Sequence, residues 1–285
     1  MEQLDYLQRF LFEHHGVRGE LVFLEDVFDT VMKQREYPSE VAMLVGKGMT
    51  AAALLSATIK YNGSLILQTQ TSGPVTLMVV QCNQALGMRA LAKWQDDANF
   101  SSGLLGNGQM VITISPESTV ERYQGVVSIT SDCLNESLET YFRQSEQLPT
   151  RLWLAANSRR AVGFLIQKMP EADLGEQKAG EEWNYWEHIQ TLAETIKDEE
   201  LLSLDATTIL HRLFHEEDIR LFEEQPVSFQ CRCDKQKMVQ ALTTMGEEEV
   251  RDILIANPVV IVTCDFCNNH YAFSPADVDE IFISS

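Results

Sequence analysis

QCRCD at residues 230–234 and TCDFCNNHY at residues 263–271 place four cysteines in the last fifth of the 285-residue chain. Thirty residues separate the first pair, Cys231 and Cys233, from the second pair, Cys264 and Cys267. Two close-spaced thiol pairs can supply the four soft ligands of a tetrahedral zinc ion and leave no position open for a substrate. The spacing therefore predicts one Zn²⁺ per chain, held by these four cysteines.

The first pair gives a reason to consider more than a structural role for this zinc. A closed four-thiolate site is usually structural, and spacing alone favours an inert metal. However, C-x-C is shorter than the C-x-x-C of ordinary zinc ribbons, and zinc-bound thiolates remain nucleophiles that oxidation can remove from the metal. We expect Arg232, Lys235 and Lys237 to offset the negative charge of the site, and His270 to be a packed or surface residue because four cysteines complete the ligand shell.

Length and composition predict a globular protein with one domain of ordinary size and a smaller one. The N-terminus, MEQLDYLQRF, is polar, and the sequence contains no run that suggests a membrane span. We therefore expect a cytoplasmic protein that does not bind membranes and whose thiols are reduced. The two remaining cysteines, Cys82 and Cys133, are expected to be small buried hydrophobic residues.

The acidic charge excludes one common role of four-cysteine zinc modules. The formal net charge is −20, and residues 171–224 alone contain 16 acidic and 4 basic residues. Such a surface repels phosphates, so we expect no nucleic-acid partner.

Residues 1–170 are predicted to form an α/β core domain. Apolar residues recur at helical spacing from Pro38 to Lys60, which predicts a buried helix. A series of short strand-like runs follows, with one helix near residues 134–142 among them: SLILQTQT, PVTLMVVQ, MRALAKW, QMVITIS, YQGVVSI, LWLAA and FLIQKM. This order predicts an α+β fold in which helices pack on a largely antiparallel sheet.

Residues 171–225 are predicted to form an acidic, amphipathic, helical linker. Trp186, Ile189 and Leu192 follow helical spacing, as do Leu213 and Phe214, while glutamates occupy the opposite faces. Like charge works against such helices standing alone, so a neighbouring surface must cover their apolar stripes.

Residues 226–285 are predicted to form a small zinc-binding domain. A module of this size is not secure on hydrophobic burial alone, and structural zinc contributes about 10–16 kcal/mol in small peptides. Between the thiol pairs the sequence predicts a helix, a turn at Gly246 and a second helix, followed by a strand in VVIVTCDFC.

Several motifs resemble those of the heat shock protein 33 family, the redox-regulated 33 kDa chaperonins. They extend along nearly the whole chain: VRGELV at 17–22, GNG at 106–108, ERYQGVV at 121–127, YFRQSEQLPTRL at 141–152, FLIQKMP at 164–170, and the cysteine pairs with NHYAF after them. The resemblance implies an ATP-independent holdase of the bacterial cytosol, not an enzyme.

The resemblance also implies a mechanism. The reduced, zinc-bound form would be inactive, and oxidants would join Cys231 with Cys233 and Cys264 with Cys267. Zinc would then leave, the small domain and linker would unfold, and the activated form would dimerise and bind unfolding client proteins. We expect the clients to bind at the uncovered linker stripes, around Trp186, Ile189, Leu192, Leu213 and Phe214, and on the sheet that these stripes cover.

Two other functions remain open at this point. A thiol–disulfide oxidoreductase would use C-x-x-C catalytically in a thioredoxin-like βαβ context. A constitutive adaptor would keep an inert zinc, and oxidation would damage it without any gain of binding.

Overall fold

Two compact units make up the chain, Met1–Phe229 (unit 1) and Gln230–Ser285 (unit 2). The computed structural model describes residues 4–13, 15–59, 62–116, 122–170 and 181–283. The described helices of the predicted linker belong to unit 1. The acidic start of that linker, residues 171–180, lies outside the described residues, and the boundaries at 170 and 225 stay predictions.

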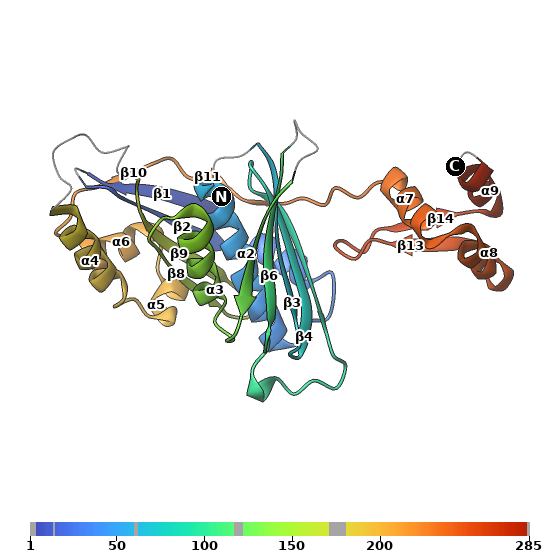
Figure 1. Cartoon of the computed structure of the whole chain (residues 1–285), viewed down its shortest axis with the longest axis horizontal. Helices are drawn as coiled ribbons and strands as arrows, with labels where there is room; N and C mark the ends of the chain where they lie inside the picture. The colour runs from blue at the N-terminus through green and yellow to red at the C-terminus, as the bar shows by residue number, and fades with distance from the viewer. Residues whose placement is uncertain (1–3, 14, 60–61, 117–121, 171–180, 284–285) are drawn as a thin grey trace. The chain divides into compact units, whose positions relative to one another are not determined.

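Unit 1 contains two six-stranded sheets rather than one (Figure 1). Sheet A has the order β10-β1-β2-β9-β8, with β11 also paired to β1, and sheet B has the order β12-β5-β4-β3-β6-β7. The strands of sheet A are β1 (Tyr6–Phe12), β2 (Val17–Leu24), β8 (Thr150–Ala156), β9 (Ala161–Lys168), β10 (Ile219–Leu221) and β11 (Gln225–Pro226). Those of sheet B are β3 (Gly63–Thr71), β4 (Val75–Asn83), β5 (Gly87–Trp94), β6 (Gly108–Pro116), β7 (Tyr123–Ile129) and β12 (Ser228–Phe229). Only β12 and β5 are parallel among the described pairs, which confirms the predicted antiparallel character.

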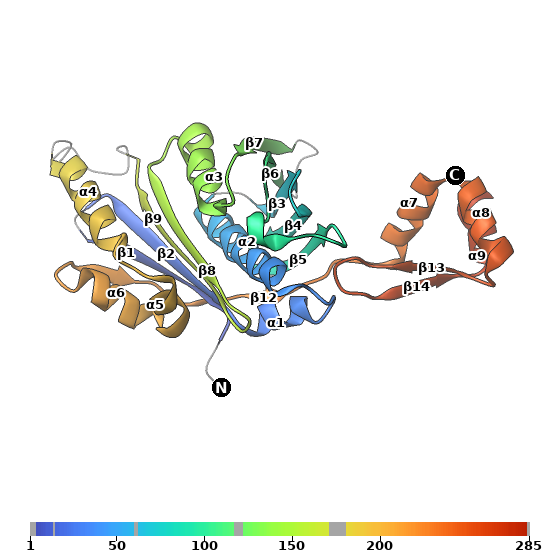
Figure 2. The same cartoon turned by 90° about the horizontal axis from the view of Figure 1, so that it is seen from below.

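Helix α2 (Ser39–Thr58) lies between the two sheets (Figure 2) and confirms the predicted buried helix. Glycines let it approach both of them: a Cβ on Gly46 would lie 3.0 Å from Ala161 of sheet A, and one on Gly48 would lie 2.7 Å from Met78 of sheet B. Among the described helices, α2 alone is long and apolar enough to cross a membrane, but 78% of the apolar window is buried inside the structure. Its apolar character therefore belongs to a core helix.

Other elements pack on both faces of sheet A, because successive side chains of its strands point to opposite faces and both sets include apolar residues. On β2, Val22 and Leu24 join the core around α2, whereas Leu21 and Phe23 join a second core under three later helices. These helices are α4 (Glu181–Ala193), α5 (Asp198–Ser203) and α6 (Ala206–Phe214). The remaining helices of unit 1 are α1 (Asp26–Met32), α3 (Leu134–Tyr141), and the single turns Phe100–Ser102 and Phe142–Glu146.

Unit 2 has a small core of its own. Its elements are α7 (Lys235–Met245), α8 (Glu247–Ala256), β13 (Val260–Thr263), β14 (His270–Phe273) and α9 (Pro275–Ile283). The helix–Gly246–helix order and the strand before Cys264 confirm the sequence prediction, whereas β14 and α9 were not predicted. The buried apolar residues are Leu242, Val250, Val260, Phe273 and Val278.

Candidate metal centre

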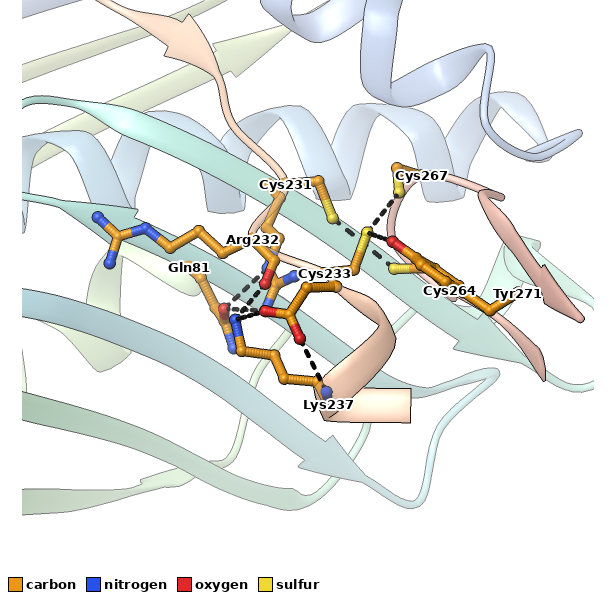
Figure 3. Close-up of polar contacts among 10 residues, drawn as sticks. Gln81, Cys231, Arg232, Cys233, Lys237, Cys264, Cys267 and Tyr271 are labelled. Atoms are coloured by element: carbon orange, nitrogen blue, oxygen red, sulfur yellow. Dashed lines mark hydrogen bonds and ion pairs between the residues drawn. The ribbon is translucent and has the colours of Figure 1, made fainter. Parts of the chain in front are cut away.

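The four cysteines predicted as zinc ligands meet in unit 2 (Figure 3). Their sulfur atoms all lie within 4.8 Å of one another. The Sγ atoms of Cys231 and Cys264 are 3.7 Å apart, and those of Cys233 and Cys267 are 3.4 Å apart. The two chain segments that carry the thiol pairs therefore converge on one point.

Two local structures bring the thiols together. Cys231 and Cys233 immediately precede α7, whose first turn is capped by the Asp234 carboxylate accepting from the Lys237 N–H at 2.8 Å. The second pair lies in a tight turn between β13 and β14, in which the Cys264 carbonyl accepts from the Asn268 N–H at 2.9 Å. Asn268 has φ +54°, a left-handed conformation that asparagine tolerates better than most residues.

The protonation of these sulfurs depends on a cation. Burial raises the pKa of the Cys264 and Cys267 thiols above the usual value. The Tyr271 hydroxyl donates to Cys233 Sγ at 3.2 Å, and this hydrogen bond raises the pKa of Tyr271 to about 12. Without a metal, burial therefore disfavours the thiolates of Cys264 and Cys267, and a bound divalent cation would reverse that preference.

The cluster fits a tetrahedral thiolate site. Zn–S bonds of about 2.3 Å in a tetrahedron place the sulfurs about 3.8 Å apart. Two of the sulfur pairs, at 3.7 and 3.4 Å, lie near that value, and all four sulfurs fall within 4.8 Å. Four cysteines could thus hold one metal ion after small side-chain adjustments.

Nearby charged and polar residues have their own partners. Lys235 Nζ lies 3.0 Å from the Asp277 carboxylate, and Lys237 Nζ lies 3.2 Å from Asp234 and also donates to the Arg232 carbonyl. The two lysines expected to offset the charge of the site are therefore largely neutralised by carboxylates. His270 is exposed and shares a 2.8 Å hydrogen bond with the Thr263 hydroxyl, apart from the four sulfurs.

The two other cysteines differ from each other. Cys82 is buried, as predicted, and burial raises its pKa to about 12. The prediction that Cys133 is buried was wrong: it is exposed. It immediately precedes α3, and the residue before the first turn of a surface helix need not face the core.

The five residues predicted to bind clients lie in α4 and α6, which together with α5 form the helical cover of the outer face of sheet A. Trp186, Ile189, Leu213 and Phe214 are buried there, and Leu192 is partly buried against the same core. They confirm that a neighbouring surface covers the apolar stripes; that they bind clients stays a prediction.

The sequence predicted that these stripes cover a sheet, but it did not identify the residues of that surface. This surface is rich in aromatic rings: Phe12 of β1 meets Phe214 edge to face at 5.1 Å, and Phe164 of β9 stacks on Trp153 at 5.0 Å between ring centroids. The alternation in FLIQKM and in YLQRFLF was the available signal, because both runs place large apolar residues two apart.

Polar contacts also attach the cover to sheet A. Arg151 of β8 bridges Glu139 at 2.9 Å and Glu194, at the end of α4, at 2.8 Å. At the other end of α4, Tyr185 donates to Glu217 at 2.7 Å and its ring stacks on His15. These contacts are partly exposed, so packing of the apolar residues supplies most of the attachment.

Comparison with known proteins identifies the family. The family model for Hsp33 protein matches residues 5–274. The 33 kDa chaperonin of Methylobacillus flagellatus is 42% identical over 99% of this chain and 96% of its own length, and that of Ectopseudomonas mendocina is 43% identical over 98% and 95%. The crystal structure of the 33 kDa chaperonin from Thermotoga maritima superposes with a TM-score of 0.83 over 98% of both chains at 20% identity, which shows the same fold. The chain therefore belongs to the Hsp33 family, whose relatives carry the name 33 kDa chaperonin.

Proposed function

We propose that this protein is an ATP-independent chaperone of the holdase type, switched on when oxidation converts the four-cysteine centre into disulfides. Membership of a family of named chaperonins supports the chaperone function. The proposal of a redox switch rests on one observation. Four cysteine sulfurs, contributed by two distant segments of a small unit, lie within 4.8 Å of one another. Unfolding proteins would be its partners, and it would act in the cytoplasm without catalysing a reaction.

Zinc is the metal that suits this donor set. Four thiolates in a closed tetrahedron are typical of zinc, which would hold the sulfurs deprotonated and tie the segment before α7 to the turn after β13. Cys231, Cys233, Cys264 and Cys267 would be its ligands. One zinc per chain would thereby add a long-range link that the apolar core of unit 2 does not provide.

Unit 2 depends on that link because its core is small. Five apolar side chains are buried within the described part of the unit. A module of this size is marginally stable on apolar burial alone, and binding of a structural metal adds directly to its folding free energy. We therefore expect unit 2 to unfold once the four sulfurs can no longer act as ligands.

Oxidation removes the ligands in a balanced reaction. Two thiols and one hydrogen peroxide give one disulfide and two water molecules, so four cysteines consume two equivalents of peroxide. We expect the bonds Cys231–Cys233 and Cys264–Cys267. In the closed centre Cys231 also lies 3.7 Å from Cys264 and Cys233 lies 3.4 Å from Cys267, so crossed bonds compete with the local pairing.

The surface that would bind clients is the outer face of sheet A together with its helical cover. This face buries Phe10, Phe12, Phe23 and Phe164 under α4–α6. A contiguous apolar face of this kind, once uncovered, is typical of a surface that binds other proteins. The strong negative charge of the chain would keep the opened form in solution, and we expect it to dimerise.

The alternatives are less well supported. The cysteines of C-x-x-C follow a β-hairpin strand within the described part of unit 2, where a thioredoxin-like enzyme would have a βαβ unit. Burial also raises the pKa of Cys264 and Cys267, opposite to the activation of a catalytic thiol. A constitutive adaptor would not explain why a large aromatic face is kept under a cover.

The test compares reduced and oxidised protein in one aggregation assay. Light scattering of a thermally unfolding client is followed without ATP, while zinc and free thiols are counted in parallel. Peroxide-treated protein should suppress scattering and have lost zinc and four thiols, and reduced protein should do neither. Equal protection by both forms would favour the adaptor, and disulfide reductase turnover without protection would favour the oxidoreductase.

A matched pair of variants assigns the effect to the centre. Cys133→Ser removes an exposed thiol outside the cluster and should leave zinc content and activation unchanged. Cys264→Ser removes one ligand and should abolish stoichiometric zinc binding. Loss of activation in Cys133→Ser would place the redox switch elsewhere.

A further inference from the structure

Residues Ile219–Phe229, which we call the strap, lie along the open edges of both sheets of unit 1. Through β10 and β11 the strap pairs with β1 at the edge of sheet A, and through β12 it pairs with β5 at the edge of sheet B. After one more residue, the chain reaches Cys231. The strap is therefore the direct covalent link between the sheet edges and the metal centre.

Few apolar contacts hold the strap in place, and its side-chain polar contacts, such as Arg220 with Glu13 and Arg9 with Gln225, both at 3.2 Å, are partly exposed. Its three strands contain 3, 2 and 2 residues, and among its side chains only that of Val227 is buried. Leu221 and Phe222 are 42% and 46% exposed. The middle of the strap borders a cavity of about 550 Å³, lined also by Arg9 and Glu20, so this part packs loosely against the sheet. Segments with exposed main-chain hydrogen bonds and little apolar burial open first.

The main chain of β1 faces the strap through alternate residues. The Arg9 carbonyl accepts from the Phe222 N–H at 3.0 Å, and the Glu13 N–H donates to the Asp218 carbonyl at 2.8 Å. Leu11 lies between them, opposite Arg220. Since alternate residues of an antiparallel strand direct their main-chain groups to the same side, the N–H and C=O of Leu11 also face the strap. Departure of the strap leaves these groups unpaired.

We propose that release of the strap turns the edge of β1 into a binding site for an extended segment of an unfolding client, which adds to sheet A as a new strand. This inference rests on the proposed function and names the way in which the client is held. An unpaired strand edge is a template for another chain, and main-chain pairing gives affinity without requiring a sequence. A holdase that meets many unrelated clients needs such a mode of binding.

The apolar residues beside the edge add to its fit for a client. Phe10 and Phe12 of β1 belong to the outer face that α4–α6 cover, so opening the cover exposes them next to the edge. An added strand would lay its alternate apolar side chains on that face. A second copy of this chain, with its net charge of −20, meets stronger repulsion at this edge than a less charged client segment, so we expect the dimer of the activated form to use another surface.

Hydrogen exchange measured by mass spectrometry tests the site directly in the full chain. The amides of Leu11 and Glu13 should be protected in the reduced protein, become unprotected after peroxide treatment, and regain protection when a thermally unfolded client is bound. Amides that stay unprotected in the client complex would overturn the proposal. Protection regained by oxidised protein alone, as it dimerises, would assign the edge to a second copy and would also overturn it.

Two substitutions at Leu11 distinguish the contribution of main-chain pairing to client binding from that of the side chain. Leu11→Ala keeps both main-chain groups, so the oxidised variant should capture client as the unchanged protein does. Leu11→Pro removes the N–H that faces the strap and should reduce client capture about tenfold, since a buried hydrogen-bond partner is lost and the strand edge is blocked. Equal loss in both variants, or in neither, would contradict strand addition. If Leu11→Pro does not fold, the exchange measurement on the unchanged protein still decides.

The same experiments distinguish this inference from the proposed function. If the oxidised, unchanged protein fails to capture client at all, the holdase proposal fails. If it captures client while the β1 amides stay unprotected and Leu11→Pro captures equally well, the holdase proposal stands and strand addition is wrong.

Discussion

Truncating Phe214 should activate the chaperone without any oxidant. Phe214 is 2% exposed on α6, and its ring lies edge to face with Phe12 at 5.1 Å. Removing a buried phenyl ring costs about 3–5 kcal/mol, through lost transfer free energy and the cavity that remains. The substitution Phe214→Ala removes this stabilisation from the closed cover and leaves the four cysteines untouched.

The size of the effect follows from the free energy. Each 1.4 kcal/mol is a factor of ten in an equilibrium constant, so the equilibrium constant for opening the cover should rise by a factor of about 10² to 4 × 10³. In the aggregation assay, reduced Phe214→Ala should suppress scattering of a thermally unfolding client, whereas the reduced unchanged protein should not. Zinc analysis should still give one ion per chain, because the substitution lies in unit 1.

A control variant separates opening of the cover from general destabilisation. Phe28→Ala makes the same chemical change at a side chain that is 1% exposed in the core around α2, away from the cover. It should destabilise unit 1 by a similar amount and give no activity in the reduced state. Equal activation by both variants would refute the reasoning, as would a Phe214→Ala protein whose cover opens by hydrogen exchange but which binds no client.

Three further outcomes can be measured. Cys264→Ser, or a chelator that strips zinc, should unfold unit 2 and collapse the amide signals of residues 230–285 in an NMR spectrum, while the unit 1 signals persist. Peptide mapping after peroxide should find Cys231 joined to Cys233 and Cys264 joined to Cys267; mainly crossed pairs would contradict the local pairing. Burial raises the pKa of Glu20 to about 7, above its value in the unfolded chain, so the folded state binds the proton more tightly. The contribution of Glu20 to stability should be greatest below about pH 4.5 and fall by about 3 kcal/mol as pH rises to 7, a part of the pH dependence that Glu20→Gln should remove in urea unfolding at several pH values.

The sequence predicted the metal centre because short segments encode it. Each thiol pair lies within a few residues, and the turn at Asn268 is set by a local left-handed residue and its neighbours. Only the approach of the two pairs to each other depends on the tertiary fold. Four cysteines with this spacing are typical of ligands to a single metal ion. That is why all four ligand candidates converge as predicted.

The strap shows what the sequence could not reveal. Strands of two or three residues have no measurable periodicity, and their partners on β1 are more than 200 residues away, as the 214-residue separation of Gln8 and Phe222 illustrates. The division into two sheets was missed for a related reason. Similar apolar runs serve both sheets, and the clue was α2, whose apolar character on all sides is typical of a helix between two layers.

The alternation of side chains along sheet A bears on how the protein would recover after stress. The face of sheet A toward α2 stays buried in the main core whether α4–α6 are docked or not, since Val22 and Leu24 belong to a different core from Leu21 and Phe23. In the open molecule sheet A would therefore stay folded, and its outer face would keep the shape that fits α4–α6. When reductant and zinc return, only α4–α6 need to dock again on this folded face. Return to the closed form should therefore be much faster than folding of the whole protein.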